Sequence, residues 1–437
     1  MNINTPIVNF VNTYSQGEAI RFHMPGHKGQ NFLGLEHLDI TEINGADDLF
    51  APNSIILDSE NEASAIFHTA HSYFCTGGSS GCIKAMIFLA MQESDNNKIL
   101  AGRNAHKSFI HAAALLDLNV QWMYGEQGDN ILISNITPQY LESELKKSSI
   151  IPMAVYVTSP DYLGNILDIQ SLAKICDKYN VMLIVDNAHG AYLTMIDHHP
   201  IQLGATMCCD SAHKTLPVLT GGAYLHTKKH FEVARSALAM FNSTSPSYLI
   251  LQSLDMANNF LKDKELLFHT IELIKSTKHK IKQLGFYILE TEPLKITIFA
   301  SKTGITGIEL AQILEENNIY PEYSDEDFVV LMCTSQNSNT EYKKLLDVLS
   351  LIPIKNELPT ITFPIINRVS SNVSIRSAMF SKSRSIKIED SLGLVCSKVT
   401  ASCPPAIPLL VPGEVITKED IAYLKNLNIL EVSVMST

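Results

Sequence analysis

The strongest constraint on the fold is an alternation, between residues 70 and 230, of short apolar runs with amphipathic stretches. This order is typical of strands joined by crossover helices in a largely parallel sheet. Between two of the runs, apolar residues of the segment 169–179 recur close to helical spacing after Asp168, which is placed to cap a helix. The sequence therefore predicts an α/β fold with a mostly parallel sheet. The runs that we interpret as strands are 99–102, 153–159, 181–186, 206–210 and 221–226.

The flanking regions have other patterns and suggest the domain organisation. The N-terminal region has little sustained periodicity, and Pro25, Gly26 and Gly29 in HMPGHKGQ indicate a turn-rich arm. One long helical region is expected at 246–284, followed by a strand-like run at 287–301. We predict an N-terminal arm at 1–50, a large domain at 51–285 and a smaller C-terminal α+β domain at 286–437.

Composition and charge exclude several classes of function. The 437 residues carry a formal net charge of -12 and no basic stripe, so nucleic acid is not an expected partner. No apolar run approaches the roughly 20 residues that a membrane span needs, and the first residues lack the pattern of a signal peptide. The eight cysteines form no CxxC pair and the histidines no HExxH motif, so no metal site is expected. We expect a cytoplasmic protein with reduced, mostly buried thiols.

The densest chemical signal is SAHKTLPVLTGGAYLH, in which Lys214 directly follows the apolar run 206–210. A lysine in a protected pocket can form a Schiff base with an aldehyde, although a surface lysine is the ordinary alternative. Upstream, Asp186 ends another apolar run, at the carboxyl edge where open α/β sheets bind ligands. A carboxylate there can keep the ring nitrogen of pyridoxal phosphate (PLP) protonated, while a helix N-cap is the alternative role. Lys214 and Asp186 together predict a PLP site.

Other polar residues are placed to complete such a site. Gly78, Ser79 and Ser80 precede a helix whose N-terminus can bind a phosphate, although a simple tight turn has the same composition. His106, in RNAHKS, can stack on a cofactor ring, or it can be an ordinary core or surface histidine. Further residues near the two central ones can contact the cofactor or the substrate, or be structural polar residues: Asn187, His189, Ser211 and His213.

Eight segments, in order along nearly the whole chain, resemble the signature of the PLP-dependent ornithine/lysine/arginine decarboxylase family in its short form, which lacks an N-terminal wing domain. They are RFHMPGHKG, TGGSSGCIKAM, GRNAHKS, TSPDYLGNILDI, IVDNAHGAY, SAHKTLPVLTGGAYLH, STSPSYLILQSLD and PPAIPLLVPGE. The S-x-H-K-T and PGHKG elements are specific, and the Gly/Ser loop is much less so. The resemblance implies the aspartate-aminotransferase fold (fold type I of PLP-dependent transferases), with a large PLP domain, a smaller C-terminal domain and a homodimer with active sites at its interface.

The resemblance also implies roles for individual residues. Lys214 would carry the cofactor, Asp186 would pair with the pyridine nitrogen, and His106 would stack on the ring. The implied reaction is decarboxylation of lysine, arginine or ornithine to agmatine or a diamine, with a proton returned to the α-carbon by Lys214 or His213. The residues implied near the phosphate are Gly78, Ser79, Ser80, Ser211 and His213, with Thr244 and Ser245 reaching the cofactor from the neighbouring subunit.

Two segments depart from the family pattern, and they leave the substrate open. The chain has SPDYL where the family has SPTY followed by an acidic or aromatic residue, and SCPPAIP where the family has PYPPGIP. Cys403 and Ala406 therefore stand where the family tends to have Tyr and Gly. The four prolines of this C-terminal segment favour an extended backbone.

Fold and cofactor do not decide which bond at the α-carbon breaks, so an aminotransferase or a lyase is an alternative reaction. An aminotransferase needs an arginine for the α-carboxylate, and the C-terminal candidates are Arg368, Arg376 and Arg384. A PLP-binding protein without catalytic activity is a third hypothesis. Turnover of a basic amino acid distinguishes the three.

Overall fold

The computed structural model describes residues 5–125, 131–359, 373–400 and 406–436. The chain forms two compact units, and each unit combines segments that are distant in the sequence. The first unit consists of Met1–Glu93, Met182–Thr270 and Thr334–Gln336, and the second of Ser94–Val181, Ile271–Cys333 and Asn337–Thr437. The predicted domain boundaries at residues 50 and 285 stay predictions.

The first unit contains four strands of the central sheet, in the order β1-β7-β6-β5. Their bounds are β1 (His71–Cys75), β5 (Met182–Asp186), β6 (Met207–Asp210) and β7 (Ala223–Thr227). β5 and β6 are parallel, with Asp186 opposite Cys209, whereas β7 pairs antiparallel with both β6 and β1. Nearly every residue of these strands is buried, as expected for strands covered on both faces.

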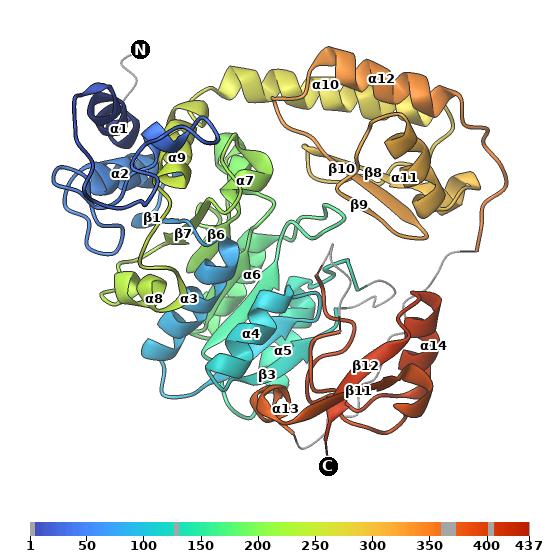
Figure 1. Cartoon of the computed structure of the whole chain (residues 1–437). Helices are drawn as coiled ribbons and strands as arrows, with labels where there is room; N and C mark the ends of the chain where they lie inside the picture. Colours follow the sequence, from blue (N-terminus) through green and yellow to red (C-terminus); the bar gives the residue numbers. More distant parts are fainter. Residues whose placement is uncertain (1–4, 126–130, 360–372, 401–405, 437) are drawn as a thin grey trace. The chain divides into compact units, whose positions relative to one another are not determined.

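Helices cover these strands. α3 packs against β6, β7 and the helix α8, and α1, α2 and α9 pack on one another (Figure 1). Gly78 precedes α3 with φ +73°, a left-handed conformation that a glycine adopts without strain. The helices are α1 (Pro6–Gln16), α2 (Ile55–Phe67), α3 (Ser79–Gln92), α7 (Ala212–Thr215), α8 (Ala234–Phe241) and α9 (Tyr248–Phe260), with short 3₁₀ turns at Glu36–Leu38 and Ala191–Ile196.

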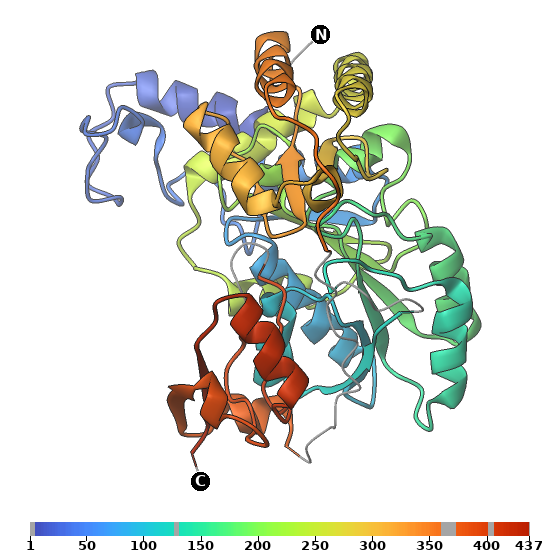
Figure 2. The ribbon, with the colours of Figure 1, turned by 90° about the vertical axis from the view of Figure 1, so that its right-hand side faces the viewer.

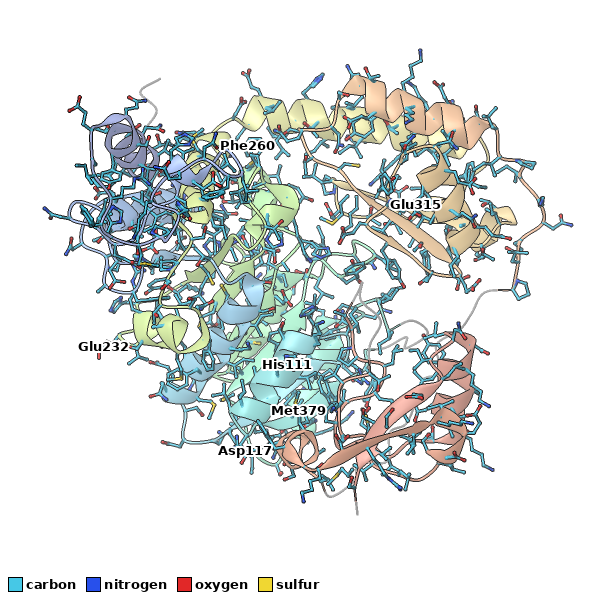
Figure 3. All side chains as sticks on the ribbon, in the orientation of Figure 1. His111, Asp117, Glu232, Phe260, Glu315 and Met379 are labelled. Atoms are coloured by element: carbon cyan, nitrogen blue, oxygen red, sulfur yellow. The ribbon has the colours of Figure 1, made fainter. Side chains whose placement is uncertain are left out.

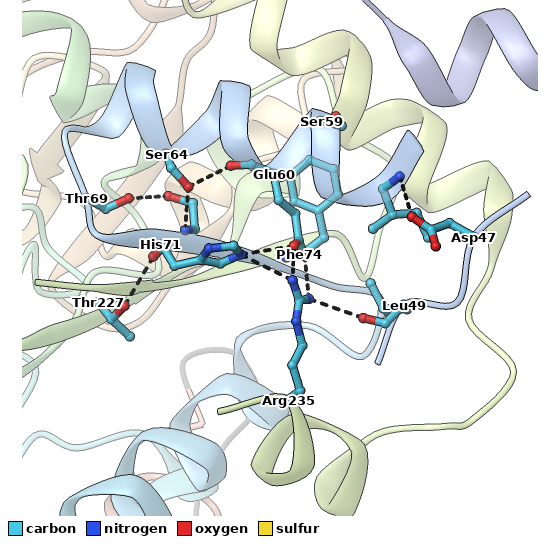
Figure 4. Close-up of polar contacts among 12 residues, drawn as sticks. Asp47, Leu49, Ser59, Glu60, Ser64, Thr69, His71, Phe74, Thr227 and Arg235 are labelled. Atoms are coloured by element: carbon cyan, nitrogen blue, oxygen red, sulfur yellow. Dashed lines mark hydrogen bonds and ion pairs between the residues drawn. The ribbon is translucent and has the colours of Figure 1, made fainter. Parts of the chain in front are cut away.

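A buried glutamate ties three of these elements together. Glu60 of α2 is fully buried, and its carboxylate accepts from both terminal nitrogens of Arg235 in α8, from His71 and from the backbone N–H of Phe74 in β1 (Figure 4). Removal of one member of such a buried group leaves the others without partners, which is strongly destabilising. These contacts therefore fix the strand that leads into the Gly/Ser loop.

The second unit contains three sheets. The strands of the central sheet run β4-β2-β3, and β2 is parallel to both of its neighbours. A second sheet has the order β8-β10-β9 with antiparallel pairs, and a third is the antiparallel pair β11-β12. The strands are β2 (Lys98–Gly102), β3 (Asn119–Met123), β4 (Ala154–Thr158), β8 (Lys295–Phe299), β9 (Tyr323–Ser324), β10 (Phe328–Met332), β11 (Ser383–Lys387) and β12 (Glu431–Met435).

Seven helices lie within the described part of the second unit, and α10 (Lys264–Gln283) passes from the first unit into it. α11 packs on β10, and α13 packs on α4, where Figure 3 labels Met379 and His111. Residues of α14 and β12 share a small apolar core, so the helix lies against the β11-β12 sheet (Figure 2). The helices are α4 (Lys107–Leu115), α5 (Pro138–Lys147), α6 (Ile169–Lys178), α11 (Gly307–Glu316), α12 (Asn339–Ser350), α13 (Ile375–Phe380) and α14 (Lys418–Asn426), with 3₁₀ turns at Ala300–Thr303 and Ile388–Asp390.

The predicted α/β class is confirmed, and each of the five predicted strands overlaps an observed one, namely β2, β4, β5, β6 and β7. The predicted cap is also present, because Asp168 accepts from the backbone N–H of Ser171 at 3.0 Å at the start of α6. All seven cysteines within the described residues are buried free thiols. Among those residues, none of the helices is long and apolar enough to cross a membrane.

Three predictions of secondary structure were wrong. The arm contains α1, whose buried Ile7 and Val11 lie one helical turn apart. The region 246–284 is two helices, because the chain breaks after α9 and Asp263 caps a new helix by accepting from the N–H of Leu266. Only 295–299 of the run 287–301 is a strand, because Glu292 turns the chain before it by accepting from the N–H of Leu294.

Candidate active site

Asp186 is the last residue of β5, at the carboxyl edge of the parallel pair β5-β6, as predicted. Its residue surface is 2% exposed. Its Oδ1 accepts from the backbone N–H of Ala188 at 3.2 Å and from the Cys209 thiol at 3.7 Å. A carboxylate in this position is shielded from water, so its attraction for a cationic ring nitrogen is strong.

Lys214 lies in α7, the short helix that follows β6. Its Nζ is 2.8 Å from Nε2 of His189, which comes from the loop after β5. The structure therefore brings together two predicted site residues from the ends of neighbouring strands. His213 lies beside Lys214 in the sequence, and its Nδ1 is 3.0 Å from the carbonyl oxygen of Gly222.

The Gly/Ser loop lies against the segment after β6. Gly78 is the N-cap of α3 and Ser79 and Ser80 are its first two residues, so their backbone N–H groups lie in the first turn of a 14-residue helix. The Ser211 hydroxyl donates to Ser79 Oγ at 2.8 Å. Four of the residues predicted near the phosphate thus lie on two segments that contact each other.

Asn242, the C-cap residue of α8, contacts this loop and was missed by the sequence analysis. Its Oδ1 would lie only 2.2 Å from a Cβ atom added at Gly77 or at Gly81, so the loop wraps around this side chain. Its Nδ2 donates to the carbonyl oxygen of Leu238, and its Oδ1 accepts from the Cys75 thiol at 3.2 Å. The glycines flanking the loop are therefore required by Asn242, which no local pattern near residue 77 reveals.

Three other predicted site residues lie at the start of α4 and between α8 and α9. His106 is in the second unit, where it caps α4: its Nδ1 accepts from the N–H of Ser108 at 3.2 Å. Thr244 and Ser245 are in the first unit, exposed between α8 and α9. Their roles as the stacking residue and as contacts across a subunit interface stay predictions.

The SPDYL segment forms a tight turn around Asp161. This side chain is fully buried, and its carboxylate accepts from the backbone N–H groups of Ser134, Gly164 and Asn165 and from the Asn165 side chain. Burial raises the pKa of Asp161 against the opposing effect of these hydrogen bonds and of Lys295. The aspartate that departs from the family pattern therefore has a structural role here.

The second segment that departs from the family pattern, SCPPAIP, contacts the start of α4 through Ala406. The carbonyl oxygen of Ala406 accepts from the N–H of Lys107 at 2.9 Å, and Ala406 has φ +57°. Glycine adopts this left-handed conformation without the strain that alanine incurs. Two residues on, the carbonyl oxygen of Pro408 accepts from Arg103 Nη1 at 2.6 Å. Cys403, Pro404 and Pro405 lie outside the described residues.

Two of the three arginines considered for an aminotransferase clamp lie within the described residues. Arg376 Nη1 donates to the carbonyl oxygens of Ala114 and Leu115 at the end of α4. Arg384 is exposed on β11, and Arg368 lies outside the described residues.

The set of groups in the first unit fits PLP. It offers a lysine amine beside an imidazole, a buried carboxylate at a strand end, and two serine hydroxyls at a helix N-terminus. These are the groups that an aldehyde, a pyridinium nitrogen and a phosphate require.

Comparison with known proteins agrees with this assignment. The family model described as Orn/Lys/Arg decarboxylase, major domain, matches residues 5–296. The chain is 30% identical to an arginine decarboxylase of Bacillus anthracis, covering 96% of this chain and 92% of that protein. It is 28% identical to an arginine decarboxylase of Bacillus subtilis, covering 97% of this chain and 94% of that protein.

Solved structures show the same fold. The lysine decarboxylase of Francisella novicida superposes with a TM-score of 0.81 at 18% identity, covering 100% of this chain and 82% of that one. The serine palmitoyltransferase of Sphingomonas wittichii, a fold type I PLP enzyme, has a TM-score of 0.58 at 14% identity, covering 80% of this chain and 84% of that one. The predicted fold class is confirmed.

Proposed function

We propose that this chain, which belongs to the Orn/Lys/Arg decarboxylase family, binds PLP on Lys214 and removes the α-carboxylate of lysine, arginine or ornithine as carbon dioxide. The family consists of PLP-dependent amino-acid decarboxylases, and the choice of substrate and of residues is our proposal. The observation that carries it is the approach of Lys214 and His189 in the loops after β6 and β5, with Asp186 buried at the end of β5.

PLP, when bound, supplies a protonated ring that takes up the electrons released as the α-carboxylate leaves. Asp186 holds the proton on the ring nitrogen, and its burial keeps water from weakening that ion pair. Ser79, Ser80 and Ser211, with the N-terminus of α3, bind the phosphate and so fix the position of the ring.

Lys214 is the better candidate for the group that returns a proton to the α-carbon. Its Nζ is within hydrogen-bond distance of His189, so the imidazole can exchange a proton with the amine during the reaction. His213 is the alternative acid, and its Nδ1 is 3.0 Å from the carbonyl oxygen of Gly222.

A homodimer is part of the proposal. The arm places large apolar side chains in solvent, and an exposed patch of this kind commonly marks a protein interface. Thr244 and Ser245 are exposed as well, so they are available to a neighbouring subunit. The exposed fractions in the arm are 83% for Ile20, 93% for Phe22, 76% for Phe32 and 90% for Leu33.

The test is turnover by the PLP-loaded protein of arginine, lysine and ornithine, with mass spectrometry of every product. Arginine comes first because the relatives that cover the chain most fully are named arginine decarboxylases. We expect carbon dioxide and an amine. A keto acid would instead establish an aminotransferase, and cofactor binding without turnover would establish a silent paralogue.

The role of Lys214 has its own test. Borohydride reduction of the wild-type protein is expected to trap a covalent cofactor adduct, and Lys214→Ala is expected to lose it. Lys229→Ala, at an exposed lysine paired with Glu93, is the matched control and should keep the adduct. An adduct that persists in Lys214→Ala would contradict the assignment.

A further inference from the structure

A fully buried carboxylate that the proposed mechanism does not use lies next to the candidate site. Asp210 ends β6 and is 0% exposed. Its Oδ1 accepts from Asn187 Nδ2 at 2.7 Å, and its Oδ2 is 3.1 Å from His199 Nε2 and 3.2 Å from His226 Nε2. The network continues from His226 Nδ1 to the Ser72 hydroxyl at 2.8 Å. Asp210 therefore joins four segments of the first unit.

The two imidazoles keep this carboxylate ionised. Burial acts to raise the pKa of Asp210, but His199 and His226 outweigh it, and the pKa is lowered from the ordinary value. Burial lowers the pKa of His226 against the opposing effect of Asp210. A buried carboxylate supplied with three N–H donors is stable, whereas the same group with a missing donor is costly.

The same cluster has the residue types of a metal site, but its contacts favour hydrogen bonding. Among the described residues, His199, Cys208 and Asp210 place possible ligand atoms within 4.8 Å of one another. However, both Asp210 oxygens already accept from N–H groups, and burial raises the pKa of the Cys208 thiol. Within the described part of the chain, His199 Nδ1 is buried without a hydrogen-bond partner, whereas most metal-binding histidines are oriented by a second hydrogen bond.

Two residues of this network are direct sequence neighbours of proposed cofactor-binding residues. Asn187 directly follows Asp186, and its backbone N–H donates to the carbonyl oxygen of Cys209 at 3.0 Å. A Cβ added at Gly190 would lie 2.1 Å from Asn187 Oδ1, so this side chain is closely confined. Ser211, which contacts Ser79, directly follows Asp210. One carboxylate thus fixes the ends of β5 and β6 relative to each other.

We infer that Asp210 is a positioning residue of the cofactor site, which acts through Asn187 to hold Asp186 and through its own backbone to hold Ser211. This inference rests on the proposed PLP function. It predicts that the contact between Asp210 and Asn187 contributes to cofactor affinity and not only to folding, because a displaced Asp186 or Ser211 binds the ring or the phosphate less well.

The experiment compares Asp210→Asn, Asn187→Ala, their double variant and Ser72→Ala in the full-length chain. Ser72→Ala is the matched control, because it cuts the same network at its far end and leaves the contact of Asp210 with Asn187 intact. The dissociation constant of PLP and the thermal midpoint of the cofactor-free protein are measured for each.

We expect Asp210→Asn and Asn187→Ala each to raise the PLP dissociation constant about tenfold, which is about 1.4 kcal/mol. The double variant should be no weaker than the worse single variant, because Asp210→Asn removes the charge of the acceptor and Asn187→Ala removes the donor, so both changes act on the same contact. Ser72→Ala should lower the thermal midpoint but change the dissociation constant less than about twofold, since its contact is remote from Asp186 and Ser211.

Three results would overturn the inference alone: an unchanged dissociation constant in Asp210→Asn, full additivity in the double variant, or a stoichiometric divalent metal that Asp210→Asn loses. A wild-type chain that binds no PLP would overturn the proposed function together with the inference. The two failures are therefore distinguishable.

Discussion

Two buried aspartates, one in each unit, show how differently the same side chain can be accommodated. Asp210 in the first unit and Asp161 in the second are both 0% exposed. Asp210 is held by side chains, and two imidazoles lower its pKa. Asp161 is held mainly by backbone N–H groups, and burial raises its pKa. Burial alone therefore does not decide the ionisation of a carboxyl group, and the charge and origin of its partners do.

Among the variants that test this difference between the two aspartates, Asp210→Ala is expected to have the largest effect on stability. This change leaves two imidazoles and the Asn187 amide without their acceptor, so we expect a loss of unfolding free energy of about 3 to 5 kcal/mol. Urea unfolding of the cofactor-free protein measures it. A loss as small as that of an exposed substitution such as Lys229→Ala would show that the network contributes little to folding.

A smaller loss, about 1 to 3 kcal/mol, is expected from Asp161→Ala. The change strands backbone donors, but it also removes a buried charge whose raised pKa shows that burial outweighs its partners. The same urea experiment serves. If Asp161→Ala proved more damaging than Asp210→Ala, the ranking of side-chain over backbone partners would be reversed.

The two sites should also respond to pH with opposite signs. The folded pKa of Asp210 is lowered, so its contribution is present above the unfolded value of 3.8 and is lost as pH falls through the folded pKa. The folded pKa of Asp161 is raised, so its contribution is present below 3.8 and is lost as pH rises through the folded pKa.

As pH falls from about 7 towards about 3, the free energy of unfolding of the wild type should therefore decrease relative to that of Asp210→Asn. Over the same range, the free energy of unfolding of the wild type should increase relative to that of Asp161→Asn. Unfolding midpoints across this range measure both differences. If the two differences in stability changed with pH in the same direction, the proposed contrast between the two aspartates would be wrong.

The smallest effect is expected at Ala406, which lies in the same unit as Asp161 and two residues before the contact of Pro408 with Arg103. Ala406→Gly should raise the unfolding free energy by about 1 kcal/mol, because glycine adopts φ +57° without the strain of a Cβ atom. Asn318→Gly is the control: Asn318 has the same φ, but asparagine tolerates it well and should gain less. If both variants gained the same free energy of unfolding, backbone strain at Ala406 would not explain the effect.

A residue of the candidate site could be predicted from the sequence only where its neighbours in the sequence determine its position. Lys214, Asp186 and the Gly/Ser loop each follow or precede an apolar run, so their places at strand ends and at a helix start could be predicted. Asn242 could not, because it acts on Gly77 and Gly81 from a segment about 160 residues away, and only packing brings the two together.

The sequence by itself determined the α/β class, the presence of the five strands and the place of Asp186 at a strand end, because hydrophobic periodicity and turn residues act over a few neighbouring positions. Only the tertiary structure decided that Asp161 organises a turn, that Arg376 binds the end of α4, and that Asp210 meets His199 and His226. Those outcomes depend on which buried donors reach which acceptors, and because buried polar groups must find partners wherever the fold places them, no local pattern contains the answer.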